Sequence, residues 1–245
     1  SLMFVASAMQ GSEEYARSRT AFAFFTVGLL NTFTNYGHHT YHLPQSAWVH
    51  WTSFIVSMLE LLILAKICLD VGQLLRKRDS ASEDPVIDGF LRSTTLWTFL
   101  MLTLAIVIAI PPLNALLHGT HAISAHVMGS MVGIDSMILW AGMAYLVRSV
   151  AGSGHPSLQR ASVRVSVRMI SVFLFGFIGV YLLRGASAGW SRYAGATASD
   201  HSTLVALFPT LMMIFGAGLM ASTLWVLVNW MAALARAGTQ SSCER

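Results

Sequence analysis

Residues 204–235, LVALFPTLMMIFGAGLMASTLWVLVNWMAALA, contain no charged side chain. A helix needs about 20 apolar residues to cross the ~30 Å hydrocarbon core of a bilayer, and this run exceeds that length. The whole chain has the same character, because 55% of its 245 residues are hydrophobic and only 11% are charged. A soluble domain carries about 25% charged residues. We therefore expect an integral membrane protein.

Five further apolar runs precede this one, and together they predict six spans. The spans lie at about 20–41, 47–72, 91–112, 119–148, 166–188 and 204–235. The runs are too long for strands and show no period-2 alternation, so we predict an all-α, polytopic membrane bundle of six transmembrane helices. Segments 1–19 and 236–245 flank this bundle, which covers 20–235. The short apolar run 2–9 indicates the end of an earlier helix, and hence the C-terminal part of a longer protein.

The positive charges are distributed very unevenly over this topology. Six spans put both termini on one side, together with thirteen of the 15 Lys and Arg residues, whereas Arg184 and Arg192 fall on the other side. Cytoplasmic loops carry such an excess, so we predict that both termini are cytoplasmic. The net charge of +4 is explained by this asymmetry, and we expect no nucleic-acid partner. Two cysteines exclude a disulfide scaffold and a metal site made of Cys alone.

The histidines gather at the opposite end of the predicted bundle, where eight of the nine lie in the outer half. Imidazole is a common ligand of iron, copper and haem, so this clustering predicts a metal or haem site near the outer face. We interpret His42, His50 and His201 as interfacial residues in contact with lipid headgroups. His38 and His39 end the first span, where two unsatisfied imidazoles would be costly, so metal binding and a structural role both stay open for this pair.

Four other residues inside the spans are candidates for chemistry. His126 and Met128 lie in the fourth span. Positions two apart on a helix point about 200° apart, so ligands there would let one helix hold a flat cofactor on either side. The alternative for Met128 is packing in the core. Glu60 lies in the middle of the second span, where a carboxylate without a nearby cation is a functional candidate. For Asp135, a structural role and a role in a proton path stay equally open.

Three motifs together resemble the haem–copper oxidase superfamily, and within it the large (cytochrome b) subunit of bacterial nitric oxide reductase. Residues 36–41, YGHHTY, are similar to the GHH-aromatic motif that ends the family's seventh helix. Residues 57–60, SMLE, resemble the Ser-x-x-Glu of the eighth helix, and residues 118–126, HGTHAISAH, resemble the HGTx…AH segment that enters the tenth. The resemblance covers most of the chain and is strongest from about residue 30 to 145.

The resemblance implies helices seven to twelve of a twelve-helix fold in a bacterial inner membrane, with a site towards the periplasm that reduces the gas NO to nitrous oxide. His38 and His39 would bind the non-haem metal, which is iron in nitric oxide reductases and copper in oxidases. His126 would be the axial ligand of a high-spin haem b, and Glu60 would be the acid beside this binuclear centre. His121 would lie near the haem propionates.

Two departures from the family pattern affect these expectations. The first six helices are absent from this sequence, so we expect an N-terminal half or a partner subunit to supply them. Met128 replaces the second histidine of the family's His-x-His pair. We therefore expect Met128 to ligate a second, low-spin haem b, with packing in a chain that lacks this haem as the alternative.

The alternatives for the function differ in their metals and electron source. They are an oxygen-reducing terminal oxidase, an NO dismutase of the same superfamily, an electron-carrying haem anchor of the membrane, and haem-free transport. The electron donor would be a cytochrome c subunit or a quinol. The choice between these two stays open, since the sequence contains neither a CxxCH motif nor a recognisable quinol site.

Overall fold

A computed structural model describes residues 17–34, 43–76, 84–152, 160–195 and 202–243. Nearly all of these residues are helical, and the described ranges contain no strand. The elements are α2 (Arg19–Thr34), α3 (Ala47–Arg76), α4 (Pro85–Ala109), α5 (Pro111–Leu117), α6 (His121–Met128), the π-helix η3 (Gly129–Ser136), α7 (Met137–Ala151), α8 (Ala161–Tyr193) and α9 (Ser202–Cys243). The prediction of an all-α fold is therefore confirmed for the described part of the chain.

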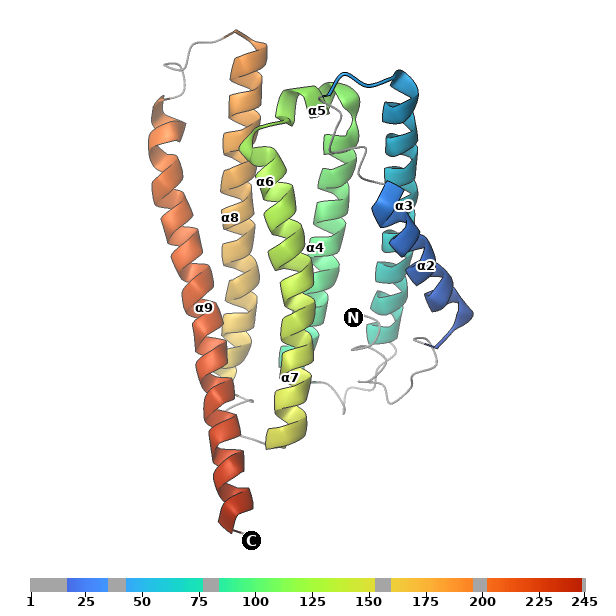
Figure 1. Cartoon of the computed structure of the whole chain (residues 1–245). Coiled ribbons are helices and arrows are strands. Elements are labelled where there is room, and N and C mark those ends of the chain that lie inside the picture. The colour runs from blue at the N-terminus through green and yellow to red at the C-terminus, as the bar shows by residue number, and fades with distance from the viewer. Residues whose placement is uncertain (1–16, 35–42, 77–83, 153–159, 196–201, 244–245) are drawn as a thin grey trace.

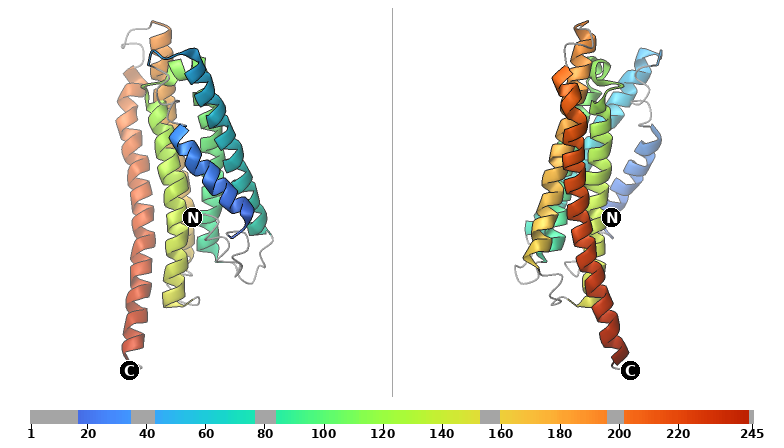
Figure 2. Two further views of the ribbon diagram at one scale, coloured as in Figure 1. Left: turned by 45° about the vertical axis from the view of Figure 1, so that its right-hand side comes forward. Right: turned by 90° about the vertical axis from the view of Figure 1, so that its left-hand side faces the viewer.

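The long helices run side by side, roughly along one axis (Figure 1). The elements α6, η3 and α7 follow one another without a break and form one continuous rod. This rod contacts α4, α8 and α9, while α3 packs against α4 and α2 packs against α3. Figure 2 shows α2 crossing α3 obliquely at the edge of the bundle. The bundle therefore has a central group of four rods and a peripheral pair of helices.

Four helices are long and apolar enough to cross a membrane. They are Pro85–Ala109, His121–Ala151, Ala161–Tyr193 and Ala206–Thr239. They correspond to the last four predicted spans and indicate a helical membrane bundle. The first two predicted spans fall on α2, α3 and residues outside the described ranges, so the total of six spans stays a prediction. The last helix also continues through Cys243, so the predicted tail 236–245 is helical over most of its length.

Helix α4 begins at a cap that also joins it to α7. The Asp84 carboxylate accepts hydrogen bonds from the backbone N–H groups of Val86 and Ile87, at 2.9 and 3.2 Å. A proline at the first helical position suits a helix start, because its missing N–H would have no partner there. The same carboxylate lies 3.5 Å from the guanidinium of Arg148, in the last turn of α7. The cap thus fixes the start of α4 against the end of α7.

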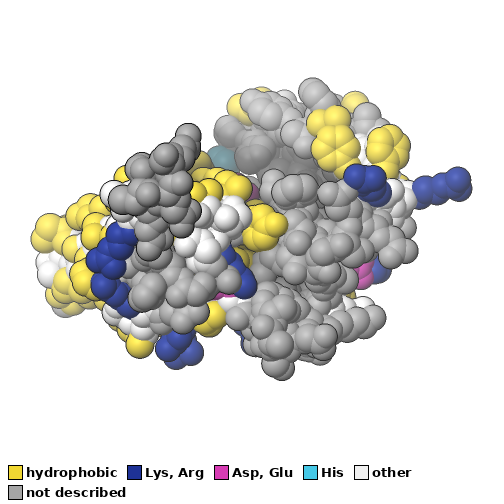
Figure 3. Space-filling view, turned by 90° about the horizontal axis from the view of Figure 1, so that it is seen from below, with side chains coloured by type: hydrophobic (Ala, Val, Ile, Leu, Met, Phe, Trp, Pro, Cys, Tyr) yellow, Lys and Arg dark blue, Asp and Glu magenta, His cyan; other side chains and the backbone are white. Residues whose placement is uncertain are grey.

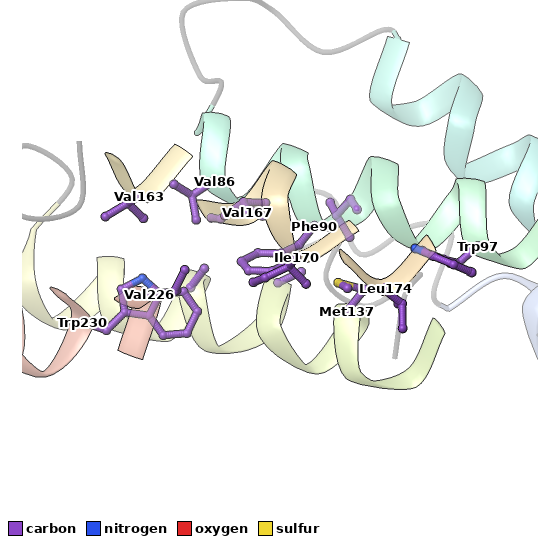
Figure 4. Close-up of a cluster of buried hydrophobic side chains, with 14 of the residues drawn as sticks. Val86, Phe90, Trp97, Met137, Val163, Val167, Ile170, Leu174, Val226 and Trp230 are labelled. Carbon is purple, nitrogen blue, oxygen red and sulfur yellow. The ribbon is translucent and has the colours of Figure 1, made fainter. Parts of the chain in front are cut away.

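The hydrophobic core lies between α4, α7, α8 and α9 (Figure 4). Its largest members are aromatic: Phe90 stacks on Trp140 with ring centroids 6.2 Å apart, and Trp230 lies 5.5 Å from Trp140. Phe90 and Trp230 are almost completely buried. Because lipid is as apolar as these side chains, close packing and not water exclusion stabilises such contacts inside a membrane. The core therefore fixes the relative positions of the four central rods.

Glycines allow several of the helix pairs to approach closely. On α8 and α9 the contact is reciprocal: a Cβ added at Gly176 would lie 2.1 Å from a ring atom of Phe215, and one added at Gly218 would lie 2.4 Å from Phe173. On η3, added Cβ atoms at Gly129 and Gly133 would meet the side chains of Met101 and Trp97 on α4. Two further glycines, Gly185 and Gly189 on α8, face the candidate site.

Candidate functional site

The predicted metal pair lies in a part of the chain that the structure leaves undescribed. His38 and His39 fall in the gap 35–42, between α2 and the start of α3, outside the described residues. The backbone of Glu60 belongs to α3, and Glu60 comes thirteen residues after Ala47, the first residue of that helix. At 1.5 Å per residue this places Glu60 about 20 Å along the helix. The side chain of Glu60 is also outside the described part of the structure.

The segment 118–126, by contrast, is fully described and forms a tight turn between two helices. His118 ends α5, and Gly119 has a φ of +70°, which a residue with a Cβ rarely adopts. Thr120 caps α6, because its hydroxyl accepts a hydrogen bond from the N–H of Ala122 at 3.2 Å. The Gly-Thr pair of the motif therefore has a local structural role in starting the helix that carries His126.

Helix α8 holds this turn from the side. An added Cβ at Gly185 would lie 2.1 Å from the backbone nitrogen of Ala122, and one at Gly189 would lie 2.4 Å from the carbonyl oxygen of Leu116. Arg192 donates hydrogen bonds from Nη2 to the carbonyl oxygens of Leu116, at 2.8 Å, and His118, at 3.0 Å. The sequence marks Arg192 only as one of two cations on the outer side. It does not predict the hydrogen bonds by which Arg192 holds the turn at His118.

His126 lies five residues after the start of α6, about 8 Å along the helix, and is half-buried with its Nδ1 atom inside the structure. Its neighbours on the packed face of α6 are Ala122 and Ala125, which are almost fully buried. The small side chains leave the imidazole as the largest group on this flank of the helix. The close contact of α8 with the N-terminal end of α6 thus positions His126.

A π-helical segment begins immediately after this turn of α6. The N–H of Gly129 donates to the carbonyl oxygens of both Ala125 and His126, and the hydroxyl of Ser130 donates to the His126 carbonyl at 3.0 Å. At the end of this segment the Ser136 hydroxyl donates to the carbonyl of Met131, five residues back, at 2.9 Å. π-Helical turns are rare and occur frequently at functional sites. Nothing in the sequence pattern predicted this one.

Met128 lies on the opposite flank of α6 from His126, as two-residue spacing requires. Its side chain is half-buried and packs against the hydrophobic core. This contact is the one expected of a packing residue. Haem ligation by Met128 stays a prediction.

His121, the first residue of α6, is exposed but lies in an aromatic group. Its ring stacks on Phe208 of α9, with centroids 5.1 Å apart and planes 24° apart, and meets Tyr181 of α8 edge-on at 5.5 Å. His121 and His126 are five positions apart and point about 140° away from each other. His121 joins α6 to α8 and α9 at the end of the bundle, and its place near the haem propionates stays a prediction.

Asp135, the other predicted acid, is exposed on η3. Within the described ranges, no three His, Cys, Asp or Glu side chains lie close enough together to hold a metal ion. A complete metal site would need the residues outside these ranges or another chain.

Comparison with known protein families and with curated proteins found no match to this chain.

Proposed function

We propose that this chain is the catalytic-subunit half of a nitric oxide reductase-like membrane complex, which reduces two NO molecules to nitrous oxide and water with two electrons and two protons. The observation that carries the proposal is the position of His126. It lies one and a half turns inside a central rod of the bundle, behind a turn whose Gly119 and Thr120 both belong to the family motif. A histidine held this rigidly on a membrane helix is suited to ligate haem iron.

The donor set fits a haem and a second metal. His126 would supply an imidazole ligand to the haem iron, and His38 and His39 would supply two ligands of the non-haem iron. When bound, the two metals supply electrons to two NO molecules held beside each other. The chain's own part is to hold these imidazoles at the outer end of the bundle and to keep water and other ligands away through the apolar packing around α6.

Glu60 has the role of moving protons towards the site. Its backbone lies about 20 Å along α3, and that of His126 lies about 8 Å along α6, which starts below the start of α3 in Figure 1. Because α6 starts lower, the two residues lie closer in depth than these two lengths alone suggest. A carboxyl group on a membrane helix beside the centre is suited to relay protons to it.

The proposal requires a partner with further helices. Val127, Met131 and Leu139 are exposed apolar residues on the rod that carries His126, with the exposed Asp135 between the last two in sequence. The N-terminal half of a twelve-helix fold would cover these residues, supply the missing ligands and connect the site to the electron donor. The site would then lie towards the periplasmic side of a bacterial inner membrane, with both termini of this chain in the cytoplasm.

Metal analysis of the purified complex tests the proposal. Haem with one equivalent of non-haem iron supports a reductase, haem with copper would indicate an oxidase, and haem alone would indicate an electron carrier. His126→Ala should remove the high-spin haem from the complex, whereas His155→Ala, outside the candidate site, should leave it in place. Full haem content in His126→Ala would refute the proposed role of His126.

A second candidate is an NO dismutase, which needs no external electrons. The observation that favours it is the contact of Met128 with the hydrophobic core, because a packing role leaves the chain without a ligand for the low-spin haem. Product analysis separates the two activities: a reductase forms nitrous oxide only when a reductant is supplied, whereas a dismutase converts NO without one.

A further inference from the structure

Helices α4 and α8 form a parallel seam at the basic end of the bundle. Three contacts define it. A Cβ added at Gly89 would lie 2.9 Å from Val167, the hydroxyl oxygens of Ser93 and Ser171 are 2.6 Å apart, and the rings of Trp97 and Phe175 lie 6.4 Å apart. The two residue numbers differ by 78 in each contact. The two helices therefore run in the same direction and in constant register over at least two turns.

One side of this seam is buried and the other is open. Phe90 and Thr94 on α4 and Ile170 and Leu174 on α8 turn towards the core and are almost fully buried. Arg92 comes just before the contact residue Ser93, and Arg168 comes just after the contact residue Val167. In two parallel right-handed helices, these positions lie on the same side of the seam, away from the core. Both arginines are exposed, and so is Arg164, one turn before Arg168.

The two arginines lie near the N-terminal ends of their helices. Arg92 and Arg168 are each seven residues from the first residue of their helix, about 10 Å along the axis. Among the described residues, neither Arg92 nor Arg168 makes a hydrogen bond or an ion pair. Asp88, one turn before Arg92, is buried. No other residue of α4 or α8 is acidic. Figure 3 shows further Lys and Arg side chains around this end of the molecule.

Above the arginines the open side of the α4–α8 seam is apolar, and we call this open side the α4–α8 groove. Leu96 and Phe99 on α4 are 53% and 39% exposed, and Val172 and Phe175 on α8 are 56% and 62% exposed. Two guanidinium groups followed by an apolar groove match an anionic phospholipid, whose phosphate a guanidinium can bind with two parallel hydrogen bonds. Acyl chains would then lie along the exposed apolar side chains. A free phosphate ion would use only the lower half of this surface.

We propose that the α4–α8 groove binds an anionic phospholipid, with Arg92 and Arg168 on its phosphate and Leu96 and Phe175 along its acyl chains. This site is separate from the candidate catalytic site at the opposite end of the bundle, and its occupation does not depend on the proposed reaction. A lipid bound there bridges α4 and α8 on their outer side, next to the Ser93–Ser171 hydrogen bond.

The test uses the purified protein, in whatever complex it forms, and native mass spectrometry with added phosphatidylglycerol or phosphatidylcholine. The wild-type protein should retain phosphatidylglycerol at least about tenfold better than phosphatidylcholine. Arg92→Gln with Arg168→Gln should reduce this preference by about tenfold or more, because each basic side chain near an anionic headgroup contributes on the order of 1 kcal/mol. Each single substitution should give part of the loss.

The matched control is Arg19→Gln with Arg236→Gln, which removes the same charge from exposed positions on α2 and α9. This pair should leave the preference unchanged. Equal retention of both lipids by the wild type would overturn the proposal, and so would an equal loss in the control pair, which would indicate diffuse attraction by the whole basic end. Competition by inorganic phosphate as strong as that by phosphatidylglycerol would also contradict it, because the apolar part of the groove would then have no role.

Discussion

Arg192 on α8 donates a hydrogen bond to the backbone carbonyl of His118 at 3.0 Å, across 74 residues of sequence. A second hydrogen bond from the same guanidinium nitrogen reaches the carbonyl of Leu116. The last carbonyls of a helix have no partner within it, so these bonds satisfy the end of α5. They also hold the turn from which α6 and His126 start. The position of the candidate haem ligand therefore depends on a cation that lies far from it in sequence.

Arg192→Gln should loosen this turn without unfolding the bundle. We expect a loss of about 1 kcal/mol in the free energy of unfolding, because the hydrogen bonds are charge-assisted but the side chain is exposed. Hydrogen–deuterium exchange should become faster for the amides of residues 116–122 and stay unchanged in α9. Arg184→Gln, on the same helix, is the control and should leave exchange in this turn unchanged. Unaltered exchange in Arg192→Gln would mean that Gly185 and Gly189 hold the turn alone.

Gly185→Ala should separate α6 from α8. The added Cβ would lie 2.1 Å from the backbone nitrogen of Ala122, and backbone cannot rotate away as a side chain can. We expect a loss of about 1–3 kcal/mol in stability, as in other overpacked contacts. Thermal unfolding in detergent measures it. Gly179→Ala is the matched control on the same helix, since within the described structure nothing lies within 4 Å of its added Cβ. Equal stability of the two variants would contradict the close contact.

Much of the fold could be predicted because the apolar runs are long and uninterrupted. The run 204–235 lies within α9, and α4 ends just before Pro111-Pro112, since a residue before proline is disfavoured in the α conformation. The helix ends extend beyond most predicted spans, because helices continue into the polar interface where hydropathy no longer marks them. Membrane crossing by α2 and α3 stays a prediction, as do the haem and metal ligands.

Other features could not be predicted from the sequence for physical reasons. The π-helix Gly129–Ser136 has the composition of an ordinary membrane helix, and its extra-wide turn depends on the close packing of Gly129 and Gly133 against Met101 and Trp97. The contact of Arg192 with the turn at His118 depends on the relative height of α5 and α8, which no local pattern records. Both features lie beside His126, so the surroundings of the candidate site were less predictable than the bundle.

Substitution of the His-His pair tests the centre of the proposed function. His38→Ala or His39→Ala should abolish binding of the non-haem metal and NO turnover, while the haem stays in place, because in the proposed site His126 would hold it. Elemental analysis and the visible spectrum of the purified complex measure the two separately. Full activity in either variant would show that the pair is structural and would remove the main support for a binuclear centre.

Glu60→Gln should separate proton delivery from metal binding. The amide is nearly isosteric with the acid but cannot release a proton at neutral pH, so the metals should bind normally while turnover slows. We expect a loss of about 10²–10⁴-fold if the side chain is an obligatory proton donor. Steady-state NO consumption with an artificial reductant measures the rate, and metal content is the control. Loss of folding in this variant would instead indicate a buried structural acid.

Met128→Leu distinguishes a haem ligand from a packing residue. Leucine and methionine have similar volumes, so the contact with the hydrophobic core should survive and stability should change by less than about 1.5 kcal/mol. If the thioether ligates a low-spin haem, the oxidised wild-type complex should show a weak sulfur-to-iron charge-transfer band in the near infrared, and the variant should lack it. Methionine in place of histidine raises the reduction potential, so such a haem would accept electrons readily and pass them on with less driving force. A wild-type spectrum with high-spin haem alone would assign Met128 to packing, remove the direct route for external electrons and favour the dismutase over the reductase.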